Sequence, residues 1–242
     1  LRALFEAVRL RFGMGLQLHA LSRRPRLLLM ASRHGHCLND LLFRWRSGQL
    51  EVDIPAIVSN HPDYAELAAS YGMTFHHLPL ATGSDAGAKR AQERQVEHIV
   101  SEQQVDLVVL ARYMQILSAE FCEFLRGRAI NIHHSFLPSF KGAKPYHQAW
   151  DRGVKLIGAT CHYVTEDLDE GPIIEQDVMR IDHSDAVEDL VRCGKDVEKA
   201  VLARGLRDQA AEGLVLDGGR EAGRLQGVAQ LLHGNLFREA EG

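Results

Sequence analysis

Closely spaced cysteines are missing from this sequence. Its four cysteines, Cys37, Cys122, Cys161 and Cys193, are far apart, and none forms a C-x-x-C pair. Zinc knuckles and redox dithiols need such pairs. The spacing therefore argues against both kinds of site and predicts four reduced thiols.

The sequence also lacks a long apolar run and an excess of basic charge. No stretch approaches the roughly 18 apolar residues that span a bilayer, and the first residues do not resemble a signal peptide. The 28 basic and 32 acidic residues are interspersed, with a net charge of −4, so no stripe is available to neutralise a phosphate backbone. We expect a soluble cytoplasmic protein that binds neither membrane nor nucleic acid.

Histidine is abundant, with 13 residues, but no recognised metal-ligand motif accompanies it. Pairs occur at 34/36, 76/77 and 133/134, yet H-E-x-x-H and comparable groupings are absent. Most such histidines are packed or hydrogen-bonded side chains. The sequence predicts no metal site.

Buried-strand patterns alternate with helix-length segments through most of the chain. Continuous apolar runs at 26–31, 54–58, 107–111 and 129–133 are separated by mixed segments near 38–47, 63–71, 85–103 and 118–125. Two more strand patterns, 156–164 and 173–178, follow one another without a long helix and are expected to pair, and an apolar stripe from Val187 to Leu202 indicates a closing helix. This alternation predicts an α/β fold with a doubly wound, mostly parallel sheet.

The two ends differ from this pattern. Residues 1–24 combine one helix face, an alternating strand and a Pro25-bounded linker, which indicates the tail of an upstream module. The last forty residues are rich in Gly and Ala with weak periodicity. We therefore expect three parts, 1–24, a main domain at 25–204, and a divergent segment at 205–242.

Asn131 and His133 lie at the carboxyl end of a predicted buried strand, where alternation directs both side chains to one face. Open α/β sheets bind ligands at that edge. An amide and an imidazole there are suited to holding a carbonyl oxygen as it becomes negative. The alternative is that Asn131 caps a turn and His133 fills a gap.

An acidic stretch follows the 156–164 strand pattern. Residues 165–172 read TEDLDEGP, and most of these acids are interpreted as a solvated turn. One acid facing the Asn–His pair would act as a general base for water or as an orienter of His133.

These two motifs, NIHHSFLP at 131–138 and HYVTEDLDEGP at 162–172, resemble the folate-dependent formyltransferase family over roughly residues 26–203. The resemblance implies a formyltransferase, Rossmann-like fold in which Asn131, His133 and Asp169 are catalytic. It assigns His162, Ser135, Lys141 and Gly142 to substrate binding. It also implies that a reduced folate binds against Arg112, Tyr113, Met114, Gln115, Ile116 and Leu117.

Four features resemble the deformylase branch of that family. The 32–39 loop, SRHGHCLN, has a single glycine where a phosphate-binding loop needs several, although Arg33, His34 and His36 remain able either to bind an anion or to cap the next helix. His134 follows the motif histidine, and 37–45 reads CLNDLLFRW. Residues 1–21 resemble the last helix and strand of an ACT-type regulatory domain.

The resemblance to that branch implies a hydrolase acting on a C–N bond, in one-carbon metabolism and purine biosynthesis. It would release formate from 10-formyltetrahydrofolate, with Asn131 and His133 holding the oxyanion and Asp169 orienting or deprotonating water. No metal or redox cofactor is required, because an N-formyl group is already activated. The branch also implies a homo-oligomer. Two alternatives stay open, a glycinamide ribonucleotide type of formyltransferase and a non-catalytic folate-binding remnant.

Overall fold

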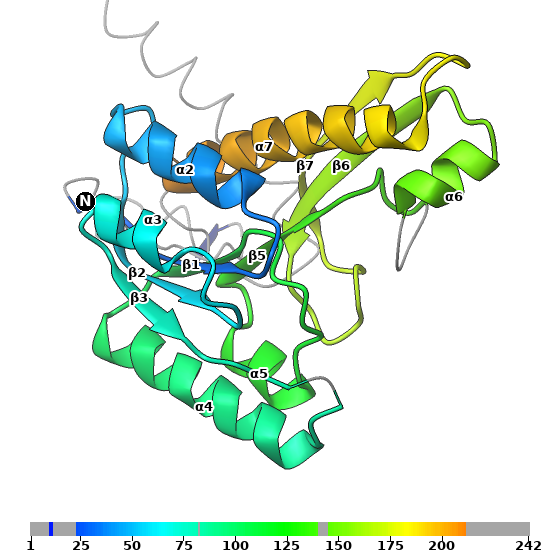
Figure 1. Ribbon diagram of the computed structural model, residues 1–242. Helices are drawn as coiled ribbons and strands as arrows, with labels where there is room; N and C mark the ends of the chain where they lie inside the picture. The colour runs from blue at the N-terminus through cyan, green and yellow to red at the C-terminus, as the bar shows by residue number, and fades with distance from the viewer. Residues whose placement is uncertain (1–9, 12–22, 82, 140–144, 212–242) are drawn as a thin grey trace, which may run out of the picture.

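The computed structural model describes residues 10–11, 23–81, 83–139 and 145–211. Lys141, Gly142, residues 212–242 and nearly all of the expected N-terminal module lie outside these ranges. Within them, a seven-stranded sheet carries helices on both faces, as Figure 1 shows. The α/β prediction is confirmed.

The sheet has the strand order β3-β2-β1-β4-β5-β6-β7. Its strands are β1 Arg26–Ala31, β2 Asp53–Ser59, β3 Thr74–His77, β4 Leu107–Leu110, β5 Ala129–His133, β6 Leu156–Tyr163 and β7 Ile173–Arg180. The pairings from β3 through to β5 are parallel, whereas β5–β6 and β6–β7 are antiparallel. The predicted mostly parallel sheet and the expected pairing of the last two strands are both present.

Side-chain alternation along β1 explains the two helical layers. Leu27 and Leu29 pack with helices α2 (His36–Arg46) and α7 (Val187–Ala211) on one face. Leu28 and Met30 pack with α4 (Ala86–Glu102) and α5 (Ala119–Phe124) on the other. A strand buried on both faces has to be continuously apolar, which is why the run at 26–31 marks the centre of the sheet.

Two elements were not expected from the sequence. Strand β3 has only four residues, two of them histidines, on the sheet edge, so it has no buried run to reveal it. Helix α6 (Pro145–Asp151) begins at a proline, which is well tolerated in a first helical turn although it breaks a helix pattern further along. Helix α3 (Ala65–Ser70) lies within an expected segment.

The closing helix is longer than its apolar stripe indicated. Helix α7 runs continuously to Ala211, across the boundary expected at 204/205. The four cysteines are free, as predicted. No helix in the part of the chain that the structure describes is both long and apolar enough to cross a membrane.

Candidate active site at the β5–β6 edge

The side chains of Asn131 and His133 lie on the same face of the sheet as Ala129, which packs with α4 and α5. Their neighbours Ile130 and Ile132 pack into the opposite core, with α2 and α7. A strand directs alternate side chains to opposite faces, so the two polar groups lie together, as the sequence predicted. His133 is only 4% exposed.

His162 is brought to Asn131 by the antiparallel pairing of β5 with β6, in which the two residues are direct partners. The Asn131 Nδ2 and His162 Nε2 atoms are 3.2 Å apart, and His162 Nδ1 lies 2.9 Å from the Tyr163 carbonyl oxygen. Because that carbonyl only accepts, Nδ1 donates to it and Nε2 accepts from Asn131. The amide keeps a second N–H for a ligand.

Asp169 reaches the same cluster from the loop between β6 and β7. Its Oδ1 lies 3.3 Å from His133 Nδ1 and 3.7 Å from His162 Nε2. Its backbone has φ +58°, a left-handed conformation uncommon outside glycine. Gly171 presses this loop against β6, since a Cβ there would lie 1.8 Å from the Tyr163 carbonyl oxygen. The structure therefore brings Asn131, His133, His162 and Asp169 together.

The electrostatics of this cluster keep Asp169 ionised. Burial alone would raise the pKa of Asp169, but its interactions with the neighbouring imidazoles, above all the hydrogen bond from His133, outweigh it and hold the pKa well below its ordinary value. His133 donates from Nδ1 to this carboxylate, whereas its Nε2 is buried without a hydrogen-bond partner. A buried unpaired nitrogen is uncommon in folded proteins. The arrangement leaves one imidazole nitrogen and one amide N–H free for a ligand.

The segment after β4, expected to contact a folate, starts with two buried residues and continues into exposed ones. Arg112 and Tyr113 are 8% and 7% exposed, whereas Met114 and Ile116 are 51% and 67% exposed. Phe136 and Leu168, on the loops after β5 and β6, are also exposed. Three loops near the Asn–His–Asp cluster thus offer apolar side chains to a ligand.

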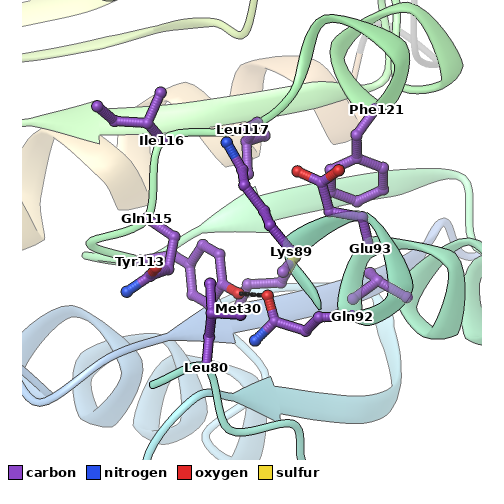
Figure 2. Close-up of a pocket in the computed structure, with 11 residues that line it drawn as sticks. Met30, Leu80, Lys89, Gln92, Glu93, Tyr113, Gln115, Ile116, Leu117 and Phe121 are labelled. Carbon is purple, nitrogen blue, oxygen red and sulfur yellow. Dashed lines mark hydrogen bonds between the residues drawn. The ribbon is translucent and has the colours of Figure 1, made fainter. Parts of the chain in front are cut away.

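A hollow lies between this segment and helix α4, as Figure 2 shows. Its volume of about 240 Å³ includes open solvent and falls below the usual 300–1,000 Å³ of a small-molecule site. The lining residues are Met30, Leu80, Lys89, Gln92, Glu93, Val96, Tyr113, Gln115, Ile116, Leu117 and Phe121.

The loop after β5 is tied to the last two strands by Thr160. Its Oγ1 donates to the Ser135 carbonyl at 2.9 Å, and it accepts from the Leu137 amide at 3.0 Å and from Gln176 Nε2 at 2.9 Å. The hydroxyl of Ser135 donates to the Ser139 carbonyl within the loop. In this structure the Ser135 hydroxyl is thus engaged in holding the loop.

A buried ionic cluster around Glu198 was missed by sequence reasoning. Glu198, on α7, is fully buried, and its Oε2 lies 2.7 Å from His36 Nε2 and 3.4 Å from Arg112 Nε. Its Oε1 accepts from the Tyr146 hydroxyl at 2.5 Å. The sequence did not indicate that Glu198 is buried, because charged residues of a helix pattern are expected to face solvent. The one indication was its position next to the apolar residues Val197, Val201 and Leu202.

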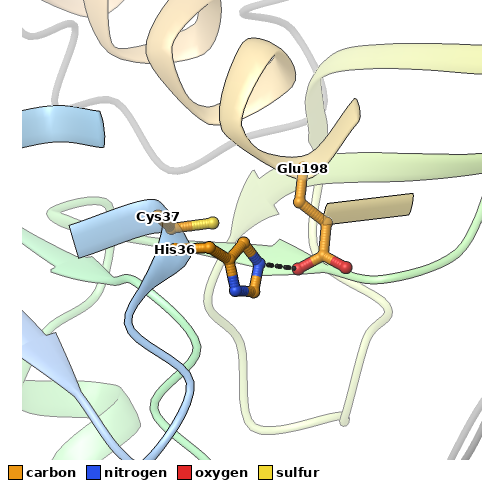
Figure 3. Close-up of side chains that lie close together, drawn as sticks. All are labelled: His36, Cys37 and Glu198. Carbon is orange, nitrogen blue, oxygen red and sulfur yellow. Dashed lines mark hydrogen bonds and ion pairs between the residues drawn. The ribbon is translucent and has the colours of Figure 1, made fainter. Parts of the chain in front are cut away.

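Cys37 completes a group with His36 and Glu198 in which the possible ligand atoms lie within 4.8 Å of one another (Figure 3). Glu198 is already paired with the Arg112 guanidinium, next to which a second cation would be repelled. Burial, followed by the Glu198 charge, also raises the pKa of the Cys37 thiol well above its usual value, which disfavours the thiolate that metals bind. We interpret the group as an internal ion network.

The fold and the cluster together define an α/β protein with an amide, two imidazoles and a carboxylate gathered beside β5. Comparison with known proteins identifies the family. Residues 25–206 match the formyl transferase family model. The chain belongs to the formyl transferase family.

Individual relatives agree with this family. The chain is 53% identical over 191 residues to a formyltetrahydrofolate deformylase of Synechocystis sp., covering 79% of this chain and 66% of the relative. A formyltetrahydrofolate deformylase structure from Pseudomonas syringae pv. tomato matches with a TM-score of 0.81 and 50% identity over 87% of this chain and 70% of that one. The chain thus spans about two thirds of the length of these relatives.

A transferase structure also shares the fold. Glycinamide ribonucleotide transformylase 1 from Symbiobacterium toebii matches with a TM-score of 0.74 and 30% identity, covering 85% of this chain and 96% of that one. The deformylases are therefore more similar to this chain than this transferase is.

Proposed function

We propose that this protein is a hydrolase that converts 10-formyltetrahydrofolate to formate and tetrahydrofolate. The observation that carries the proposal is the contact of Asp169 with His133 beside Asn131, which leaves His133 Nε2 unpartnered. The deformylase names of the similar proteins support hydrolysis over transfer. The loop at 32–39, with its single glycine, supports the same choice.

In the proposed reaction, the oxygen of water attacks the formyl carbon, and the carbonyl oxygen becomes negative. The free N–H of Asn131 and His133 Nε2, protonated, donate to that oxyanion. The C–N bond then breaks, one proton of the water goes to the folate nitrogen, and formate leaves while the second proton passes to solvent. No step requires a metal or a redox cofactor.

Of the two roles expected for Asp169, orientation fits the electrostatics better. A general base works best when its pKa lies near the working pH, and the pKa of Asp169 is lowered. A permanently ionised carboxylate at His133 Nδ1 instead fixes the orientation of the imidazole. We propose that Asp169 orients His133.

Folate binding is proposed for the segment from Arg112 to Leu117 and for His162. Backbone groups of an irregular segment can bind the polar edge of a pterin, while Met114, Ile116, Phe136 and Leu168 offer exposed apolar surface to its rings. We also propose a homo-oligomer with a cytoplasmic location. Sedimentation velocity and cell fractionation would test these two points.

The deciding experiment measures formate release from 10-formyltetrahydrofolate by the purified chain, with and without glycinamide ribonucleotide. We expect formate and tetrahydrofolate in equal amounts in water alone, with no change when the amine is added. A formylated amine product without formate would establish the transferase alternative. Folate binding without either product would establish a non-catalytic role.

A further inference from the structure

Glu198 joins three segments that end near the site from different parts of the chain. Its carboxylate contacts His36 at the start of α2, Arg112 after β4, and Tyr146 in α6. All of these contacts are formed by a side chain with no exposed surface. Removing one partner from a buried charge is costly, so the conformations of these segments depend on this carboxylate.

Arg112 is the partner that leads into the proposed folate-binding segment. Its backbone has φ +66°, which disfavours a residue with a side chain. Ser32 supports the turn from the other side, donating its backbone N–H to the Arg112 carbonyl at 3.2 Å and accepting from the Met114 amide at 2.9 Å. The Arg112 side chain, directed into the core, is held there by Glu198.

The Arg112 guanidinium has few other interactions that compensate the burial of its charge. Arg112 is 8% exposed, and its Nε makes no hydrogen bond, so the charge of Glu198 at 3.4 Å is the interaction that compensates this atom. Without the carboxylate, the guanidinium gains by turning toward water. Such a rotation would release the left-handed turn and displace the residues that follow it.

We propose that Glu198 is a positioning residue for folate binding, which acts through its ion pair with Arg112 to fix the turn from which residues 113–117 begin. Glu198 itself does not touch the substrate in this scheme. The inference rests on the proposed function, because it assumes that this segment binds a reduced folate. The proposal gives helix α7, which packs against the sheet, a role in folate binding.

The test compares Glu198→Gln, Arg112→Gln and the double variant in the full chain. We measure the dissociation constant for tetrahydrofolate by calorimetry, together with KM and kcat for formate release. Each single change is expected to weaken tetrahydrofolate binding and raise KM by about tenfold, while kcat changes by less than about threefold, as expected for displaced binding groups. The double variant should bind no more weakly than the weaker single variant.

Tyr146→Phe is the matched control, because it removes one hydrogen bond to the same carboxylate and leaves the ion pair with Arg112 in place. We expect its affinity for tetrahydrofolate to stay within about twofold of the wild type. Multiplicative losses in the double variant, or a folded Glu198→Gln protein with unchanged affinity and KM, would overturn the inference.

Three further outcomes can be told apart. If Glu198→Gln does not fold, Arg112→Gln carries the test, and unchanged affinity in that variant refutes the inference. If the wild type binds tetrahydrofolate but releases no formate, the proposed hydrolysis is wrong, whereas the dissociation constants still decide the role of Glu198. Stoichiometric zinc in the purified protein that is lost in Glu198→Gln would also overturn it, in favour of a metal site.

Discussion

At the scale of single residues, the site depends on which nitrogen of each imidazole is engaged. His162 accepts from Asn131 because its Nδ1 donates to a carbonyl, and His133 turns Nδ1 to Asp169. Each assignment follows from the partner's chemistry. Together they leave one N–H of the Asn131 amide and Nε2 of His133 without a partner in these contacts.

The first prediction concerns these groups. We expect Asn131→Ala and Asp169→Asn each to lower kcat for formate release by on the order of 10²–10³, the scale for loss of an oxyanion donor, because Asn131 is one donor and Asp169 orients the other. The exposed Asp167→Asn, in the same loop, is the control and should retain activity. Initial rates at saturating folate check this, and near wild-type turnover in either variant would refute the assignment.

The second prediction concerns pH and Glu198. Burial raises the pKa of Glu198, but the His36 hydrogen bond and the Arg112 charge outweigh it and lower the pKa to about 2 from 4.5. A carboxyl group whose pKa is lower in the folded than in the unfolded protein stabilises the fold at pH values above the unfolded pKa. This stabilisation is lost as the pH falls toward the folded pKa. Glu198→Gln should therefore destabilise the fold by about 3 kcal/mol at pH 7, with the difference from wild type shrinking below about pH 4.3.

Urea unfolding followed by circular dichroism at pH 7, 5.5, 4 and 3 measures this difference. Glu188→Gln is the control, because Glu188 lies exposed in the first turn of the same helix. A Glu198→Gln difference that stays constant or widens toward pH 3 would contradict the prediction.

At the scale of elements, the loop after β5 determines where His133 is held. Thr160 makes three hydrogen bonds to this loop and to Gln176 and has no exposed surface. Valine has the same shape without the hydroxyl. The loop is thus anchored by one polar group within an otherwise apolar strand.

The third prediction follows from that anchor. We expect Thr160→Val to destabilise the fold by about 2 kcal/mol, because buried partners are left unsatisfied, and to speed hydrogen exchange of the Leu137 amide. Thr74→Val, at an exposed position of the edge strand β3, is the control. Mass spectrometry of exchanged peptides together with thermal unfolding checks both effects, and unchanged exchange over 135–139 would count against the anchor.

At the scale of the whole molecule, the site is built by a sheet that changes strand direction. Parallel strands place the end of β4 beside β5, and the antiparallel β6 returns along β5 to set His162 opposite Asn131. The following loop then brings Asp169 back to His133. The change of strand direction thus gathers an amide, two imidazoles and a carboxylate at one edge of the sheet.

The fourth prediction is that activity does not depend on a metal. Because His36, Arg112 and Tyr146 already engage the Glu198 carboxylate, we expect dialysis against EDTA to change kcat by less than about twofold. Metal analysis before and after dialysis accompanies the assay. Activity lost with EDTA and restored by zinc would contradict this expectation.

The sequence alone determined the local features. Continuous apolar runs marked β1, β4 and β5 because strands covered on both faces cannot alternate, and the polar interruptions at Asn131 and His133 indicated a site at one strand end. The family resemblance was confirmed by the match over residues 25–206. The roles of the individual site residues stay predictions, as do the three-part division and the N-terminal module.

Only the tertiary structure decided the long-range contacts. Periodicity records which face of an element is buried, but not which charge on a distant element it meets. Asp169 lies 36 residues after His133, and Glu198 comes from another helix than its partners His36 and Tyr146. Their proximity results from strand order and loop geometry, which is why the sequence indicated Asn131 and His133 and gave no sign of the carboxylate that holds Arg112.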